Sequence, residues 1–281
     1  MYWLLKLIAA ALGRLSPRGV SGTAWVLAFL IFDILRVRRG LVLRNLAVAF
    51  PEKDTAERIL IGRLSVYNFA LTIIEFLRSQ SQDITAQVTF VGMEHAQAAL
   101  AQGRGVYVLC SHLGNWEAMG AAATRSVAPA HVLVKKVGSS SVNRFVSELR
   151  EKNGFLTVKR RKKGDGFAAI KEVLARGEIV GFVMDQARPG EPKLPFFGRP
   201  AQTNTSLAAI WQRVPAPVLP ALIRRTAVGE HVIEFFPELG LELSADAAAD
   251  VLRHTTQFSE VIEGCVRKFP EQYFWMHNRW K

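Results

Sequence analysis

The sequence predicts an α/β protein with a mostly parallel central sheet flanked by helices and a hydrophobic helical segment at the N-terminus. From about residue 87 onward, short apolar runs alternate with segments of helical periodicity, which is the pattern of a largely parallel α/β sheet. The chain has 281 residues and is 49% hydrophobic, so a sizeable core is expected and a disordered chain is excluded. Two apolar runs precede this region.

The expected strands are short and apolar, and the helices between them are often followed by a glycine. The strands cover residues 88–92, 105–111, 131–135, 155–159, 178–185, 216–225 and 232–237. The helices cover residues 93–103, 115–124, 142–154, 166–177, 205–214 and 246–268. A proline- and glycine-rich loop is expected between the strand at 178–185 and the helix at 205–214.

A long helix is expected before the sheet, within residues 51–80. Pro51 precedes it, and Asp54 followed by Glu57 is the pattern of a capping box. Leucine, isoleucine and tyrosine side chains recur at helical spacing through this segment.

The N-terminus predicts an association with membranes. Apolar runs cover residues 1–15 and 23–35, and both are shorter than the roughly 20 residues of a full membrane span. Basic side chains follow them, at Arg36, Arg38, Arg39 and Arg44. We interpret residues 1–40 as a membrane-anchoring hairpin or interfacial helix pair and residues 41–281 as the α/β domain. A pair of buried core helices is the alternative.

The formal net charge of +12 predicts attraction to an anionic partner, such as an anionic membrane surface, an acidic protein or nucleic acid. Nucleic acid is disfavoured because the basic residues are scattered and no known nucleic-acid motif is present. The two cysteines, Cys110 and Cys265, form no disulfide framework and no CxxC metal site. A reduced compartment is the simplest reading of this cysteine usage.

His112 and Glu117 follow an expected buried strand, where sites form in open α/β sheets. On one continuous helix, five residues turn through about 140°, so the two side chains would diverge. They can meet if His112 precedes the helix, Gly114 makes a sharp turn and Asn115 caps the helix. Glu117 would then fix the imidazole tautomer and leave the other nitrogen as a general base, with a substrate hydroxyl as nucleophile. A histidine that merely satisfies a helix start is an equally good reading of the spacing.

Asp185 and Gln186 follow a second buried strand, at residues 178–185. Because the carboxyl ends of parallel strands meet at one edge of a sheet, we expect these residues to share a crevice with His112. Asp185 is equally well explained as a structural cap at the end of its strand.

At these residues the chain resembles the bacterial lipid A biosynthesis acyltransferases (the lauroyl/myristoyl family), within the wider group of glycerolipid acyltransferases that carry an HX4D/E motif. The segment HLGNWE matches the HX4E form of that motif through His112 and Glu117. Further matching segments are spread along the chain in the order of the family: RNLAVAFPE (44–52), RGVYVLCSHLGNWE (104–117), REKNG (150–154), GEIVGFVMDQ (177–186), PFFGRPAQT (195–203) and PEQYFWMHNRWK (270–281).

The resemblance implies an enzyme of the inner membrane that faces the cytoplasm. It implies acyl carrier protein as the partner that carries the acyl thioester, and a hydroxyl of a lipid A precursor as acceptor. His112 would be the general base, oriented by Glu117, and no metal or other cofactor would be needed. Arg150 would stabilise an oxyanion or hold a phosphate. The expected substrate-binding residues are Arg150, Asn115, Asp185, Gln186 and Lys135.

Two other segments have readings that stay open. The basic run at residues 159–163 is either a landing patch for acidic carrier protein or lipid phosphate, or a solvated loop. Phe196 and Phe197 either line the acyl channel or pack at a turn. The alternative function is an acyltransferase for a lysophospholipid or another glycolipid that uses acyl carrier protein or acyl-CoA. A lipid-binding scaffold without catalysis is a further alternative.

Overall fold

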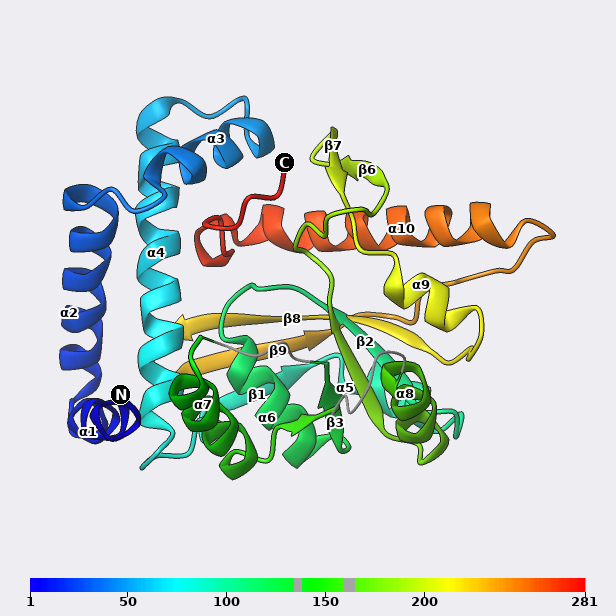
Figure 1. Ribbon diagram of the computed structural model, residues 1–281, viewed down its shortest axis with the longest axis horizontal. Coiled ribbons are helices and arrows are strands. Elements are labelled where there is room, and N and C mark those ends of the chain that lie inside the picture. Colours follow the sequence, from blue (N-terminus) through cyan, green and yellow to red (C-terminus); the bar gives the residue numbers. More distant parts are fainter. Residues whose placement is uncertain (134–137, 159–164, 281) are drawn as a thin grey trace.

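A computed structural model of the chain describes residues 1–133, 138–158 and 165–280, and it has the expected α/β architecture (Figure 1). Seven strands form one sheet in the order β1-β9-β8-β2-β5-β3-β4. Their bounds are β1 (Val88–Val91), β2 (Val106–Cys110), β3 (Ala130–Val132), β4 (Leu156–Thr157), β5 (Ile179–Val183), β8 (Val218–Ala227) and β9 (Glu230–Phe235).

The strand directions place several carboxyl ends at one edge of the sheet. β2 pairs in parallel with both β5 and β8, and β3 pairs in parallel with β4 and β5. β8 and β9 form an antiparallel pair, and β9 runs parallel to β1, so the sheet is mixed at this side. The loops that follow β2 and β5 therefore leave the sheet side by side.

The helices of the α/β region lie where the sequence predicts them. They are α5 (Met93–Leu100), α6 (Trp116–Ser126), α7 (Ser140–Lys152), α8 (Asp165–Ala175), α9 (Ser206–Trp211) and α10 (Ala247–Lys268), and a 3-10 turn, η2 (Pro270–Gln272), follows α10. The expected loop before α9 contains a hairpin that the sequence analysis missed, formed by β6 (Lys193–Phe196) and β7 (Arg199–Gln202). Pro195 faces Pro200 across this two-stranded ladder, and prolines are tolerated there because both strands are edges.

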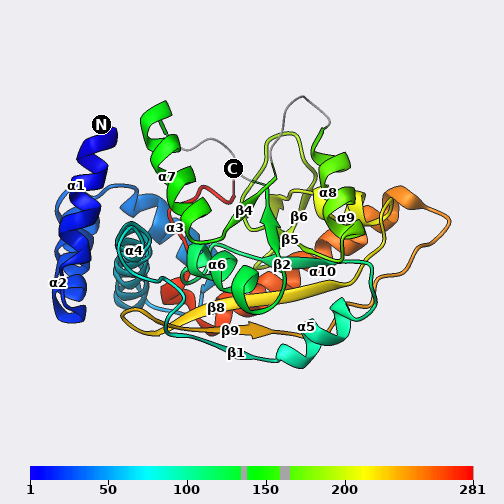
Figure 2. The same ribbon diagram turned by 90° about the horizontal axis from the view of Figure 1, so that it is seen from below.

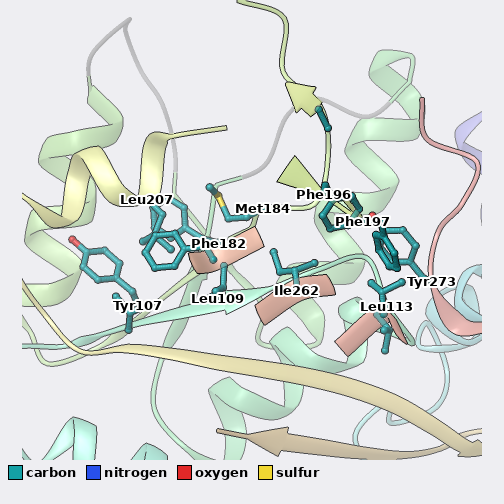
Figure 3. Packing of buried hydrophobic residues seen from close by; sticks show 14 of the residues in the cluster. Tyr107, Leu109, Leu113, Phe182, Met184, Phe196, Phe197, Leu207, Ile262 and Tyr273 are labelled. Carbon is teal, nitrogen blue, oxygen red and sulfur yellow. The ribbon is translucent and has the colours of Figure 1, made fainter. Parts of the chain in front are cut away.

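Two apolar layers cover the sheet. On one face, α10 packs over β2 and β5, with Ile262 close to Leu109 and Phe182 (Figure 3). Phe196 and Phe197 are buried in this layer, which favours the packing interpretation of that pair. On the other face, α5 lies against β8 and β9 (Figure 2), and alternate residues of β2, β8 and β9 are buried together with residues of α5 and α6. The alternation of side chains along each strand thus builds both layers.

The long helix α4 (Thr55–Arg78) begins with the expected capping box between Asp54 and Glu57. The N-terminal elements pack beside it: α1 (Tyr2–Gly13), α2 (Pro17–Ala28), a π-helix η1 (Phe29–Ile34) and α3 (Arg39–Ala49) (Figure 1). Among the described residues, α4 is the one helix that is by itself long and apolar enough to cross a membrane, and 56% of its most apolar window is buried inside the protein. The α2–η1 segment and α3 meet the same criterion together but are bent by 90°. The burial of α4 is that of a core helix.

Candidate active site

The loop after β2 places His112 at the edge of the sheet. Gly114 has a φ of +60°, and a Cβ atom there would lie 2.1 Å from the carbonyl oxygen of Ile223, so the turn requires glycine. Asn115 then caps α6, because its side chain accepts a hydrogen bond of 3.0 Å from the backbone N–H of Ala118. The expected turn and cap are both confirmed.

His112 is bound by the carboxylate of Asp185, so the two residues lie together at one edge of the sheet, as expected. Its Nδ1 lies 2.8 Å from Oδ1 of Asp185, and its backbone N–H donates to Oδ2 over 3.2 Å. Asp185 is almost fully buried, whereas the side chain of His112 is 23% exposed. The Nδ1–H tautomer donates to the carboxylate and leaves Nε2 with the free lone pair.

Each partner favours the charged form of the other. Burial acts to raise the pKa of Asp185, but the attraction and hydrogen bonds of His112 outweigh it, so the pKa of Asp185 is lowered. Burial likewise acts to lower the pKa of His112, and Asp185 outweighs it, so the pKa of His112 is raised. His112 is therefore a stronger base than an isolated histidine.

Glu117 occupies a different position from the one expected. Between His112 and Glu117, both in the described part of the chain, the structure shows no hydrogen bond. The guanidinium of Arg150 in α7 instead donates to both carboxylate oxygens of Glu117, through Nε at 2.9 Å and through a second nitrogen. The expectation that Glu117 orients His112 is thus wrong in this geometry, because the first turn of α6 directs Glu117 toward α7.

The other expected binding residues differ in where they lie relative to His112. The amide of Gln186 lies 3.4 Å from Nδ1 of His112. Asn115 is fully buried and is bound by Glu75, and it does not line the cavity described next. Lys135 and the basic run at residues 159–163 lie outside the described residues.

A cavity of about 860 Å³ opens beside the His112–Asp185 pair. His112, Glu117, Arg150 and Gln186 contribute to its wall. Most of the remaining wall is apolar and includes Val108, Cys110, Met119, Ala123, Val132, Phe155, Phe167, Ile170, Ile179, Phe182 and Ile210. The polar side chains of the candidate site and the apolar side chains therefore line the same cavity.

The C-terminal tail contributes residues that the sequence reasoning did not assign to the site. Leu113 and Tyr273 form an antiparallel bridge, and the backbone N–H of Phe274 donates to the carbonyl of His112 over 3.0 Å. Figure 3 shows Tyr273 beside Leu113. Burial, and then the negative charge of Asp185, raise the pKa of Tyr273 well above its usual range, so its phenol stays protonated. The aromatic residues of this tail were the sequence signal that could have assigned the tail to the site.

The thiol of Cys110 lies in the cavity wall, next to the loop that carries His112. Burial, together with the charge of Asp185, raises its pKa to about 12. The group is therefore a neutral thiol at physiological pH and not a thiolate nucleophile. The arrangement therefore suits an enzyme in which a histidine activates a hydroxyl of the substrate beside an apolar chamber.

The comparison with known proteins agrees with this class. The family described as bacterial lipid A biosynthesis acyltransferase matches residues 1–281, so the chain belongs to that family and is an acyltransferase. The lipid A biosynthesis lauroyltransferase of Escherichia coli (strain K12) is 24% identical over 265 residues, which cover 90% of this chain and 82% of that protein. The lipid A biosynthesis palmitoleoyltransferase of the same organism is 21% identical over 255 residues, with 88% and 80% covered.

Proposed function

We propose that this protein transfers a fatty acyl chain from the thioester of acyl carrier protein to a hydroxyl of a lipid A precursor, on the cytoplasmic face of the inner membrane. The observation that carries the proposal is the His112–Asp185 pair at an apolar cavity. Membership of the family supplies the class of acceptor.

The transfer needs one base and one site for negative charge. Nε2 of His112 takes the proton of the acceptor hydroxyl while the oxygen attacks the thioester carbonyl carbon. The tetrahedral intermediate carries the charge on its oxygen, and it collapses as the C–S bond breaks. The imidazolium then returns its proton to the departing thiolate, so an ester and a free thiol are the products. Asp185 stabilises the imidazolium between these two steps.

Arg150 is a cation in the cavity wall that can meet negative charge. Its guanidinium is fixed by both oxygens of Glu117 and stacks 5.4 Å from the ring centroid of Phe155. A guanidinium fixed in this way binds an oxyanion or a lipid phosphate with little loss of side-chain entropy. In this mechanism Glu117 acts by orienting Arg150.

The apolar cavity is the proposed chamber for the acyl chain. Its volume of about 860 Å³ lies within the range of roughly 300–1,000 Å³ that is usual for ligand sites. Its apolar wall removes the hydrocarbon from water, and each buried CH₂ contributes about 0.8 kcal/mol.

The N-terminal helices are the proposed membrane contact. They expose large apolar side chains to solvent, at Met1, Trp3, Leu4, Leu7, Ile8, Trp25, Val26, Leu27, Phe29, Leu30, Ile34 and Leu35. Arg36, Arg38 and Arg44 follow this surface in the chain and suit an anionic lipid headgroup layer. An apolar surface beside basic side chains is the pattern of an interfacial membrane contact.

A donor competition experiment tests the proposal. The purified protein receives acyl carrier protein and CoA carrying the same acyl chain with different isotopes, and a tetra-acylated lipid A precursor or a lysophospholipid as acceptor. Mass spectrometry then identifies the donor from the isotope in each product and the acceptor from the mass of the product. We expect the label of the carrier protein on the lipid A precursor. A product formed only from CoA, or only on the lysophospholipid, would contradict the proposed substrates.

A further inference from the structure

A buried carboxylate that the mechanism does not use lies directly behind the catalytic loop. Glu75 belongs to α4, which is remote in sequence from the HX4E segment, and its side chain is 7% exposed. Its carboxylate accepts hydrogen bonds from Nδ2 of Asn115 at 2.8 Å and from the backbone N–H of Gly229 at 3.0 Å. Arg225 donates to the same carboxylate through Nε at 3.1 Å and a second nitrogen at 2.8 Å, and Nε2 of His231 lies 3.2 Å away.

The same helix reaches the loop at a second point. The hydroxyl of Thr72, one turn before Glu75, donates to the carbonyl of Gly114 over 3.0 Å. Arg225 connects the two contacts, because one of its nitrogens donates to Oγ1 of Thr72 over 3.2 Å. Gly114 and Asn115 stand between His112 and Glu117, so α4 holds the middle of the catalytic motif.

The charge of Glu75 is retained despite its burial. Burial acts to raise the pKa of Glu75, but Arg225 and His231 outweigh it, so the pKa lies far below its usual range. Every partner of the carboxylate supplies an N–H donor, and the ion pair with Arg225 compensates the charge. A buried ion pair contributes little net stability compared with apolar packing, so its presence at this position points to a role in local geometry.

We propose that Glu75 is a positioning residue that acts through Asn115 to fix the loop carrying His112 and Glu117. The inference rests on the proposed acyl transfer for its functional meaning. Asn115 performs two tasks at once: its oxygen caps α6, and its amide nitrogen is bound by Glu75. The start of α6, and with it the distance between His112 and the Glu117–Arg150 pair, is thereby set from α4.

Asn115→Ser separates the two tasks of Asn115. Serine is a good helix cap but is too short to reach Glu75, and Glu75 keeps Arg225, His231 and Gly229. We expect kcat to fall roughly 10- to 100-fold, because a misplacement of about 1 Å at a reacting group costs up to about that factor. KM for either substrate should not change, since the cavity wall is untouched.

Exchanging the amide of Asn115 and the carboxylate of Glu75 provides a matched test of their contact. Asn115→Asp places two carboxylates face to face, and Glu75→Gln leaves Arg225 and His231 without their anion. The double variant restores one carboxylate and one amide at the same contact, with the aspartate still able to cap α6. We expect each single variant to lose most of kcat and the double variant to recover much of it. Full activity in folded Asn115→Ser, or the absence of recovery in the double variant, would overturn the proposal.

Hydrogen exchange makes the inference independent of any substrate. In Asn115→Ser we expect the backbone amides of residues 113–119 to exchange faster while those of α10 keep their protection. If the wild-type protein transfers no acyl chain but this local change occurs, the proposed function fails and the positioning role stands. If exchange in residues 113–119 is unchanged, the positioning role fails whatever the activity.

Discussion

At the scale of single residues, the reactivity of His112 depends on a partner from another strand. Asp185 is buried and accepts hydrogen bonds from the imidazole and from the backbone N–H of His112. These contacts keep the carboxylate ionised at its buried position, and the carboxylate in turn raises the pKa of His112. The histidine is therefore protonated over a wider range of pH than a free imidazole, and the proposed mechanism requires a pH above its raised pKa.

Asp185→Asn is expected to alter both rate and pH dependence. Without the carboxylate, the pKa of His112 falls, so the acid limb of kcat/KM moves to lower pH. The rate at the plateau should fall by about 10²–10⁴, because the tautomer and the imidazolium lose their support. The measurement is kcat/KM between pH 5 and 9.

Glu117→Gln is the matched control for Asp185→Asn. Its charge is the smallest contributor to the raised pKa of His112, and it forms no hydrogen bond with the imidazole. We expect a lower rate, since Arg150 loses its ion pair, but only a slight movement of the acid limb. A larger movement in Glu117→Gln than in Asp185→Asn would restore Glu117 as the orienting residue.

Gly114→Ala is expected to disrupt the catalytic loop. The positive φ and the close approach of the Ile223 carbonyl both oppose a side chain, and the strain costs about 1–3 kcal/mol. Thermal unfolding and acyl transfer should both decline. Gly264→Ala is the control: it lies in α10 with open space around it, and alanine there should stabilise the protein by about 0.5–1 kcal/mol. Equal melting temperatures for the two variants would contradict this assignment.

At the scale of elements, local signals predicted almost every strand and helix, and the failures have physical causes. Pro195 and Pro200 hid the β6–β7 hairpin, because proline normally marks a loop. The partners of His112 and Glu117 depend on how elements pack. β2 and β5 are paired in a register that sets Cys110 beside Val183, so two residues further on His112 meets Asp185. The capping pattern at the start of α6 is local in sequence, so it could not predict that Glu117 binds Arg150 of α7.

The lining of the cavity predicts that Gly181 influences the length of the acyl chain that the protein accepts. Gly181 of β5 lines the cavity, and a Cβ atom at this position would lie 3.1 Å from a methyl group of Val132, its paired residue on the adjacent strand β3, which also lines the cavity. Gly181→Val should narrow the chamber and favour C12 over C16 donors, with Gly181→Ala showing a smaller shift. Product masses from mixed C12, C14 and C16 donors measure the preference. An unchanged product distribution would place the acyl chain elsewhere.

At the scale of the whole molecule, one side of the protein is covered by helices that expose apolar side chains. α1 and α2 pack on α4 through small and apolar residues such as Ala9, Val20 and Ala24, and direct their larger side chains outward. The sequence predicted these apolar helices. Each of them has one buried face and one exposed face, and the membrane contact of the exposed faces stays a prediction. The catalytic loop is bound to the same helix, α4, through Thr72 and Glu75.

The outward side chains predict membrane binding. The double substitution Trp3→Ser/Leu7→Ser should weaken binding to anionic vesicles by at least about tenfold, because burial of such side chains contributes about 1.5–3 kcal/mol each. Vesicle flotation measures the bound fraction. Leu243→Ser is the control, since Leu243 is 56% exposed outside the N-terminal helices. Equal binding of all three proteins would remove the N-terminal helices as the membrane contact.

The central claim is that His112 activates a lipid hydroxyl for acyl transfer, and a single-turnover assay tests it most directly. Wild-type protein and His112→Ala receive acyl carrier protein charged with a C12, C14 or C16 chain and a tetra-acylated lipid A precursor, and mass spectrometry follows the mass gained by the lipid. Circular dichroism confirms that both proteins are folded. We predict one added acyl chain with wild-type protein and a rate lower by at least about 10²-fold with His112→Ala. Near-wild-type transfer by a folded His112→Ala protein would contradict the claim.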